Sequence, residues 1–111
     1  MVKLLDYFNM NENIYLEIGK ILSKIQHWEN EFKLLTIKYN IEKSDYKRSL
    51  SNMNSFLFRN NIINEKEYNC IKRVIEYRNF IIHKFFLEND YNKIDEMNLE
   101  IDKSLNIFKQ K

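Results

Sequence analysis

The residues best suited to chemistry in this sequence form one short cluster: Arg78, Asn79 and His83. A guanidinium keeps its charge and can hold an anion, and an imidazole titrates near neutral pH and can move a proton. In a helix, Asn79 and His83 lie one turn apart, at about 100° and 140° around the axis from Arg78. The apolar residues within about 60° of Arg78 are Ile71, Val74, Ile75, Ile81, Ile82 and Phe85. Arg78 therefore lies at the centre of an apolar face.

A charge at the centre of an apolar face needs a partner. An unpaired guanidinium costs several kcal/mol to bury, so we expect a carboxylate, backbone carbonyls, a water-filled cleft or a bound anion beside Arg78. The candidate carboxylates include Glu29, Glu31, Glu65, Glu67 and Glu76. A carboxylate partner would make Arg78 structural, and a bound anion would make it functional. Spacing alone leaves both interpretations open.

Four amphipathic helices must position this cluster. The first, over about residues 12–39, carries a heptad seam, and Asn9 with Glu12 forms a possible capping box. The seam consists of Ile14, Ile18, Ile21, Ile25, Trp28, Phe32, Leu35 and Tyr39. A second helix repeats the spacing at Tyr46, Leu50, Met53 and Leu57, with Ser44 or Asp45 as its cap.

The cluster itself falls on the third expected helix. This helix opens at Asn64, which has the acidic residue Glu67 three positions later, and runs to about Leu87. After Asn89 and Asp90, a fourth helix carries an apolar stripe of Ile94, Met97, Ile101, Leu105 and Phe108. We therefore predict an all-α, antiparallel four-helix bundle. Residues 1–11 are either a lead-in or a short extra helix.

Composition narrows the class of protein. The 111 residues suffice for a single domain, residues 1–111, and the absence of Pro with only one Gly disfavours a sheet built on tight turns. A net charge of +2 with interleaved signs provides no footprint for nonspecific DNA binding. One Cys and two His offer no workable metal spacing, so we expect no metal or cofactor. Short apolar runs and early charges argue against a membrane span or signal peptide, which predicts a cytoplasmic protein.

The motif and its setting resemble a known superfamily. The string from Glu76 to Phe86 is similar to the signature of the HEPN superfamily, small four-helix-bundle domains in which Arg, a polar residue and His follow one another on a late helix. The Arg-Asn-x-x-x-His pattern matches at Arg78, Asn79 and His83. With the helix layout, the resemblance extends over roughly residues 12–87.

The resemblance implies a metal-independent endoribonuclease, as a toxin or defence effector. The RNA 2′-OH would attack the adjacent phosphorus, with His83 as acid or base, Arg78 stabilising the phosphate and Asn79 orienting either group. It also implies a homodimer, in which Arg78 of one protomer faces His83 of its partner in a shared cleft. An antitoxin or other regulatory protein is an expected partner. In related toxins, nucleotidyltransferase antitoxins modify a Tyr two residues after the His. This sequence has Phe85 at that position, so inactivation by nucleotide transfer to it is excluded.

A second interpretation belongs to a different class. The chain could be a noncatalytic HEPN-like bundle that binds RNA or protein, with Arg78 and His83 kept for dimer structure. The cations close to the motif are Lys72, Arg73 and Lys84, a weak platform for a long RNA. Elsewhere, Trp28 is expected in the core and Cys70 as a small buried side chain.

Overall fold

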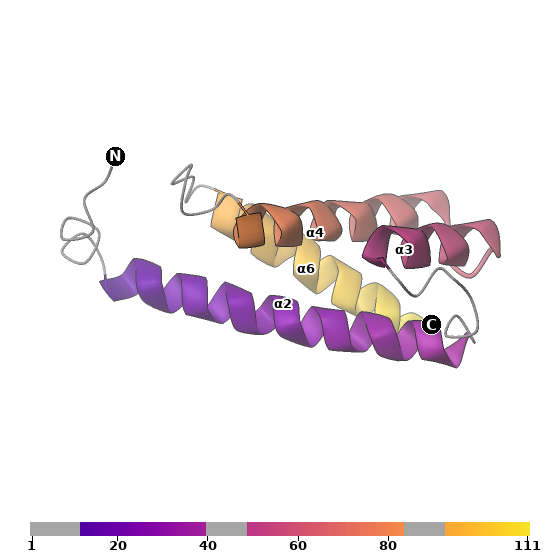
Figure 1. Cartoon of the computed structure of the whole chain (residues 1–111), viewed down its shortest axis with the longest axis horizontal. Helices are drawn as coiled ribbons and strands as arrows, with labels where there is room; N and C mark the ends of the chain where they lie inside the picture. Colours follow the sequence, from indigo (N-terminus) through magenta and orange to yellow (C-terminus); the bar gives the residue numbers. More distant parts are fainter. Residues whose placement is uncertain (1–11, 40–48, 84–92) are drawn as a thin grey trace.

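The computed structural model describes residues 12–39, 49–83 and 93–111. These residues form helices and connecting turns, with no strand among them. The helices are α2 (Glu12–Lys38), α3 (Leu50–Arg59), α4 (Glu65–His83) and α6 (Lys93–Gln110). The predicted all-α four-helix bundle is confirmed (Figure 1). The expected lead-in, the caps Ser44 and Asp45, and the Asn89-Asp90 junction lie outside the described residues.

The helix directions refine the prediction of antiparallel packing. Figure 1 shows α2, α3 and α6 running in one direction and α4 in the opposite direction. Thus α4 is antiparallel to α3 and α6, as expected. In contrast, α2 and α6 are parallel: Trp28 contacts Ser104, and Tyr39 further along α2 contacts Lys111. A simple up-and-down series would have made the first and last helices antiparallel.

The heptad seam of α2 forms one side of the core. The predicted seam residues Ile21, Ile25, Trp28, Phe32 and Leu35 are all buried. Trp28 and Phe32 meet edge to face at 5.2 Å between ring centroids, and both pack on Phe108 of α6. The indole N–H of Trp28 donates to Ser104 Oγ at 2.7 Å, so its one polar group is not left unpaired in the core.

Local sequence signals set the bounds of α3 and α4. The predicted cap of α4 is confirmed as a reciprocal box: the Asn64 N–H donates to Glu67 Oε1 at 2.9 Å, and the Glu67 N–H donates to Asn64 Oδ1 at 2.8 Å. For the second helix the predicted cap at Ser44 or Asp45 is wrong, because α3 begins later, at Leu50, and its N-cap is Ser49. Ser49 Oγ accepts the N–H of Asn52 at 3.0 Å. Between these helices Asn61 has a positive φ of 61°, the conformation that ends a helix and that Asn tolerates well.

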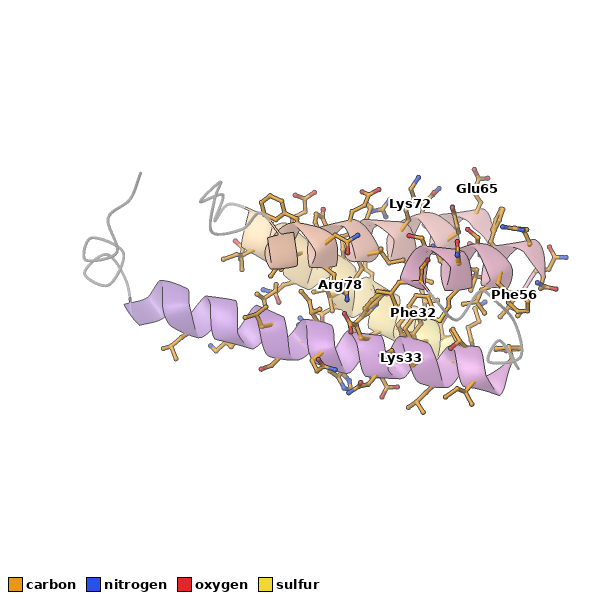
Figure 2. All side chains as sticks on the ribbon, in the orientation of Figure 1. Phe32, Lys33, Phe56, Glu65, Lys72 and Arg78 are labelled. Atoms are coloured by element: carbon orange, nitrogen blue, oxygen red, sulfur yellow. The ribbon has the colours of Figure 1, made fainter. Side chains whose placement is uncertain are left out.

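The helices do not all pack equally closely. The close pairs are α2 with α6, α4 with α6, and α3 with α4, so α6 lies against two neighbours and completes the core. The α2 and α4 backbones are not a close pair, and side chains bridge the space between them. Arg78 is one of these bridging side chains (Figure 2).

Candidate functional site

Arg78 projects from α4 toward α2 and pairs there with Glu29. Its Nε donates to Glu29 Oε1 at 2.6 Å, a charge-assisted hydrogen bond. The Arg78 side chain is 30% exposed and that of Glu29 is 14% exposed, so the ion pair is largely covered. Of the partners that the sequence led us to expect beside Arg78, the structure has a carboxylate, that of Glu29.

Asn79 lies beside the same guanidinium. Its Oδ1 accepts a hydrogen bond from a terminal nitrogen of Arg78, Nη1, at 3.0 Å, and its side chain is exposed. Among the described residues, Glu29 and Asn79 are the hydrogen-bond partners of Arg78. The structure therefore brings Arg78 and Asn79 together, and among the described residues no acceptor is hydrogen-bonded to the other terminal nitrogen of Arg78, Nη2.

His83 is the last residue of α4. Four residues of helix place its Cα about 6 Å further along the axis than that of Asn79. The side chain of His83 lies outside what the structure describes, as do the side chain of Ile82 and all of Phe85. The third predicted site residue is thus placed along the helix without a description of its contacts.

The ion pair changes one sequence-based argument. A dimer cleft was one way to keep a centrally placed Arg78 hydrated, but Glu29 satisfies it within one chain. Three of the other four candidate carboxylates are engaged or exposed elsewhere: Glu67 pairs with Lys111 at 3.1 Å, and Glu65 and Glu76 are exposed. The fourth, Glu31, is half-buried on α2 and is not a hydrogen-bond partner of Arg78 among the described residues. A dimer must therefore be argued from catalysis rather than from the solvation of Arg78.

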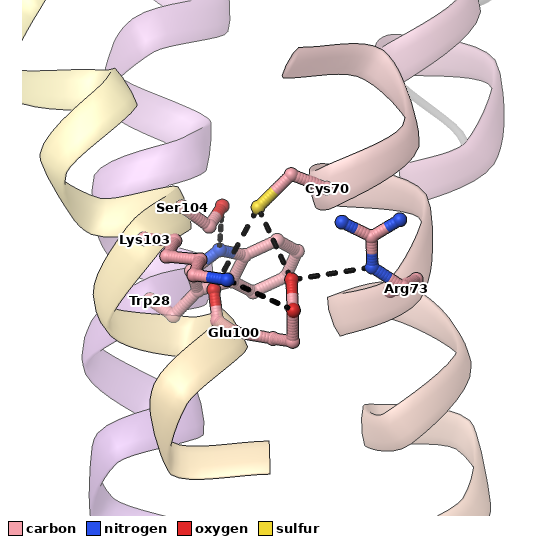
Figure 3. Close-up of polar contacts among 6 residues, drawn as sticks. All are labelled: Trp28, Cys70, Arg73, Glu100, Lys103 and Ser104. Carbon is pink, nitrogen blue, oxygen red and sulfur yellow. Dashed lines mark hydrogen bonds and ion pairs between the residues drawn. The ribbon is translucent and has the colours of Figure 1, made fainter. Parts of the chain in front are cut away.

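A second polar cluster, which the sequence reasoning missed, lies between α4 and α6. It consists of Cys70, Arg73, Glu100 and Lys103 (Figure 3). Arg73 Nε donates to Glu100 Oε2 at 3.2 Å, and Lys103 Nζ lies 3.6 Å from Glu100 Oε1. The Cys70 thiol lies 3.5 Å from Glu100 Oε2. One carboxylate thus holds groups from both helices.

The pKa values in this second cluster follow from burial and charge. Burial first, and then the Glu100 carboxylate, raises the pKa of the Cys70 thiol to about 11. Burial would also raise the pKa of Glu100, but Arg73, the thiol and Lys103 outweigh it and hold that pKa below its ordinary value. Burial and a hydrogen bond to Glu96 raise the pKa of the nearby Tyr77 to about 12. At neutral pH Cys70 is a protonated thiol and Glu100 a carboxylate, so Cys70 is not an activated nucleophile.

A sequence signal for the second cluster existed on each helix separately. Cys70 and Arg73 are three residues apart on α4, as are Glu100 and Lys103 on α6, so each pair shares a helix face. Only the packing of α6 against α4 joins the two pairs. The expectation that Cys70 is buried is confirmed, with 5% exposure.

The described residues contain no group of three or more His, Cys, Asp or Glu side chains that could hold a metal ion. In the same residues, none of the helices combines the length and apolar character needed to cross a bilayer.

Comparisons with known proteins add no family assignment. No protein-family model matches the chain, and searches of curated proteins and of solved structures found no significant match.

Proposed function

We propose that this protein is a HEPN-like, metal-independent endoribonuclease that acts in the cytoplasm as a toxin or defence effector. The observation that carries the proposal is the hydrogen-bonded pair of Arg78 and Asn79 on α4, upstream of His83 at the end of the same helix. It combines a fixed positive charge, an orienting amide and a titratable imidazole. Those three groups suit transfer at a phosphate.

RNA supplies its own nucleophile for the proposed reaction. The 2′-oxygen attacks the adjacent phosphorus, the bond from phosphorus to the 5′-oxygen breaks, and the products carry a 2′,3′-cyclic phosphate and a 5′-OH. Arg78 stabilises the charge that develops on the nonbridging oxygens, and Asn79 holds the guanidinium in place. His83 moves the proton from the 2′-OH, and a second imidazole returns a proton to the leaving 5′-oxygen.

The need for two proton-transfer groups argues for a homodimer. Each chain carries one His at the end of α4, and a two-fold axis beside this helix end would bring two copies of Arg78 and His83 into one cleft. One imidazole would then act as the base and the other as the acid. Sedimentation at tens of micromolar is expected to give a dimer, and a purely monomeric protein would contradict this arrangement. An antitoxin or other protein covering the cleft is the regulatory partner we propose.

The central test compares two histidine variants. We expect expression of the wild type to slow growth and the purified protein to cleave RNA in the presence of EDTA, with cyclic phosphate ends. His83→Ala should lower cleavage by at least about a hundredfold, the usual range for removing a general acid or base. His27→Ala is the matched control, because His27 is exposed on α2, and it should cleave like the wild type. Equal cleavage by the wild type and a folded His83→Ala protein would refute the catalytic assignment.

A second candidate function is favoured by the ion pair itself. Because Glu29 already occupies Arg78, the guanidinium can serve to join α2 to α4 without any substrate. The protein would then be a noncatalytic HEPN-like bundle that binds RNA or protein. This alternative predicts that purified wild-type protein binds RNA or a protein partner without cleaving it. It also predicts that Glu29→Gln lowers stability, because the variant removes the charge that joins α2 to Arg78 of α4.

A further inference from the structure

A surface pocket of about 340 Å³ lies between α4 and α6, on a different side of α4 from Arg78. Its polar lining includes Lys66, Arg73, Lys103 and Asn106, and Ile107 supplies an apolar wall. Glu67 and Cys70 complete the lining. The lining thus brings together cations that are 37 residues apart in the chain, from Lys66 to Lys103.

In this pocket the positive side chains are more exposed to solvent than the negative ones. The side chains of Arg73 and Lys103 are 47% and 55% exposed, whereas that of Glu100, which holds both, is only 11% exposed. The carboxylate of Glu67 is similarly covered, at 13%, and it is paired with Lys111. A ligand arriving from solvent therefore meets positive groups first, with the negative groups beneath them.

The pocket also has more positive than negative charge. Arg73 and Lys103 share the single carboxylate of Glu100, and Lys66 has no carboxylate partner among the described residues. Two positive charges in this set are therefore not matched.

Arg73 is held in a conformation suited to binding. Its Nε is fixed by Glu100, and Figure 3 shows its two terminal nitrogens directed away from that carboxylate. These nitrogens form the flat donor edge that matches two oxygens of a phosphate. Because Glu100 has already ordered the side chain, less conformational entropy is lost when a ligand binds.

We propose that this pocket binds the terminal phosphate of a small phosphorylated ligand. A phosphate monoester carries a charge of about −1.5 to −2 at neutral pH, which matches the two unmatched cations. Arg73 would bind two of its oxygens, Lys66 and Lys103 would close around them, and Asn106 could donate to a third. The wall at Ile107 would contact the organic part of the ligand. This proposal is independent of the ribonuclease proposal.

The test is a titration of ¹⁵N-labelled full-length protein followed by amide chemical shifts. Inorganic phosphate and adenosine monophosphate are added separately, with ionic strength held constant by NaCl. We expect saturable shifts at the amides of Lys66, Arg73, Lys103 and Asn106. Tighter binding of adenosine monophosphate would identify a phosphorylated organic molecule as the source of the phosphate. Equal or tighter binding of inorganic phosphate would overturn the contact between Ile107 and an organic group and would identify the free ion as the ligand.

Two variants and one control decide whether the pocket is responsible. Lys66→Gln should weaken binding about fivefold, since it removes one exposed charge. Arg73→Lys keeps a charge opposite Glu100 but removes the two-pronged donor edge, and should weaken binding about tenfold. Lys72→Gln is the control, because Lys72 is an exposed neighbour on α4 outside the pocket lining. Nonsaturating shifts, or equal weakening by Lys72→Gln, would overturn the proposal.

Discussion

Two arginines on one helix are held by carboxylates from two different helices, and the comparison separates their roles. Arg78 pairs with Glu29 of α2, and Arg73 pairs with Glu100 of α6. At Arg78 one carboxylate serves one cation, and both side chains are largely covered. At Arg73 one carboxylate serves two cations, which are about half exposed. An ion pair therefore does not by itself reveal function. The two sites differ in how many N–H donors of the cations remain after the carboxylate has accepted its hydrogen bonds.

The largest expected effect concerns the reactivity of the Cys70 thiol in the second polar cluster. Because the pKa of Cys70 is raised from 9.0 to about 11, its thiolate fraction at pH 8 falls about a hundredfold below that of an ordinary cysteine. We expect Cys70 to react with a disulfide reagent at least that much more slowly in the folded protein than in urea. Stopped-flow or manual kinetics at 412 nm would measure this. A folded-state rate close to that in urea would show that Cys70 is neither buried nor next to a carboxylate.

The next effect tests whether Arg78 and Glu29 act as a pair. Arg78→Met leaves the carboxylate of Glu29 covered and without its cation, and should lower the free energy of unfolding by about 2 kcal/mol. This is less than for a fully buried pair, because Arg78 keeps 30% exposure. Urea unfolding would measure the loss.

A double variant provides the control for that prediction. Adding Glu29→Leu to Arg78→Met removes both charges and should restore most of the lost stability, because an apolar pair can replace a covered ion pair. Strictly additive losses in the two single variants and the double variant would contradict a direct interaction across α2 and α4.

The smallest expected effect is a pH dependence of the stability that Glu100 of the second polar cluster contributes. The pKa of Glu100 is lower in the folded protein than its ordinary value of 4.5. The ionised carboxylate therefore contributes fully to the free energy of unfolding at pH values above 4.5. The contribution is lost as pH falls through the lowered folded pKa. Glu100→Gln should therefore cost about 1 kcal/mol at pH 7, since the half-exposed cations are readily rehydrated, and almost nothing at the acid end. Urea unfolding at a series of pH values would test this, and a pH-independent cost would contradict it.

Much of the fold followed from the sequence because its signals are local. The seam of α2 predicted the burial of Trp28 and Phe32, and the spacing of Asn64 and Glu67 predicted the start of α4. These features depend on residues within a few positions of one another. Helix periodicity and capping therefore sufficed to find them.

The partners across helices could not be predicted in the same way. The sequence offered several carboxylates for Arg78, and only the placement of α2 beside α4 selects Glu29. The link from Arg73 to Glu100 likewise depends on how α6 lies along α4, which no spacing within one helix determines. The parallel course of α2 and α6 also depends on how distant helices pack, so spacing within one helix did not predict it. Catalysis by His83 stays a prediction.

The position of α6 has a consequence for how the chain folds. Trp28 reaches its hydrogen-bond partner Ser104 across 76 residues, and Phe32 packs on Phe108 over the same interval. Closing so long a loop costs chain entropy before the contacts that offset it have formed. High contact order slows folding, so this bundle should fold more slowly than helical proteins whose neighbouring helices are also neighbours in sequence. Until α6 docks, Trp28 and Phe32 of α2 are without the Phe108 side chain that packs on both of them in the folded protein.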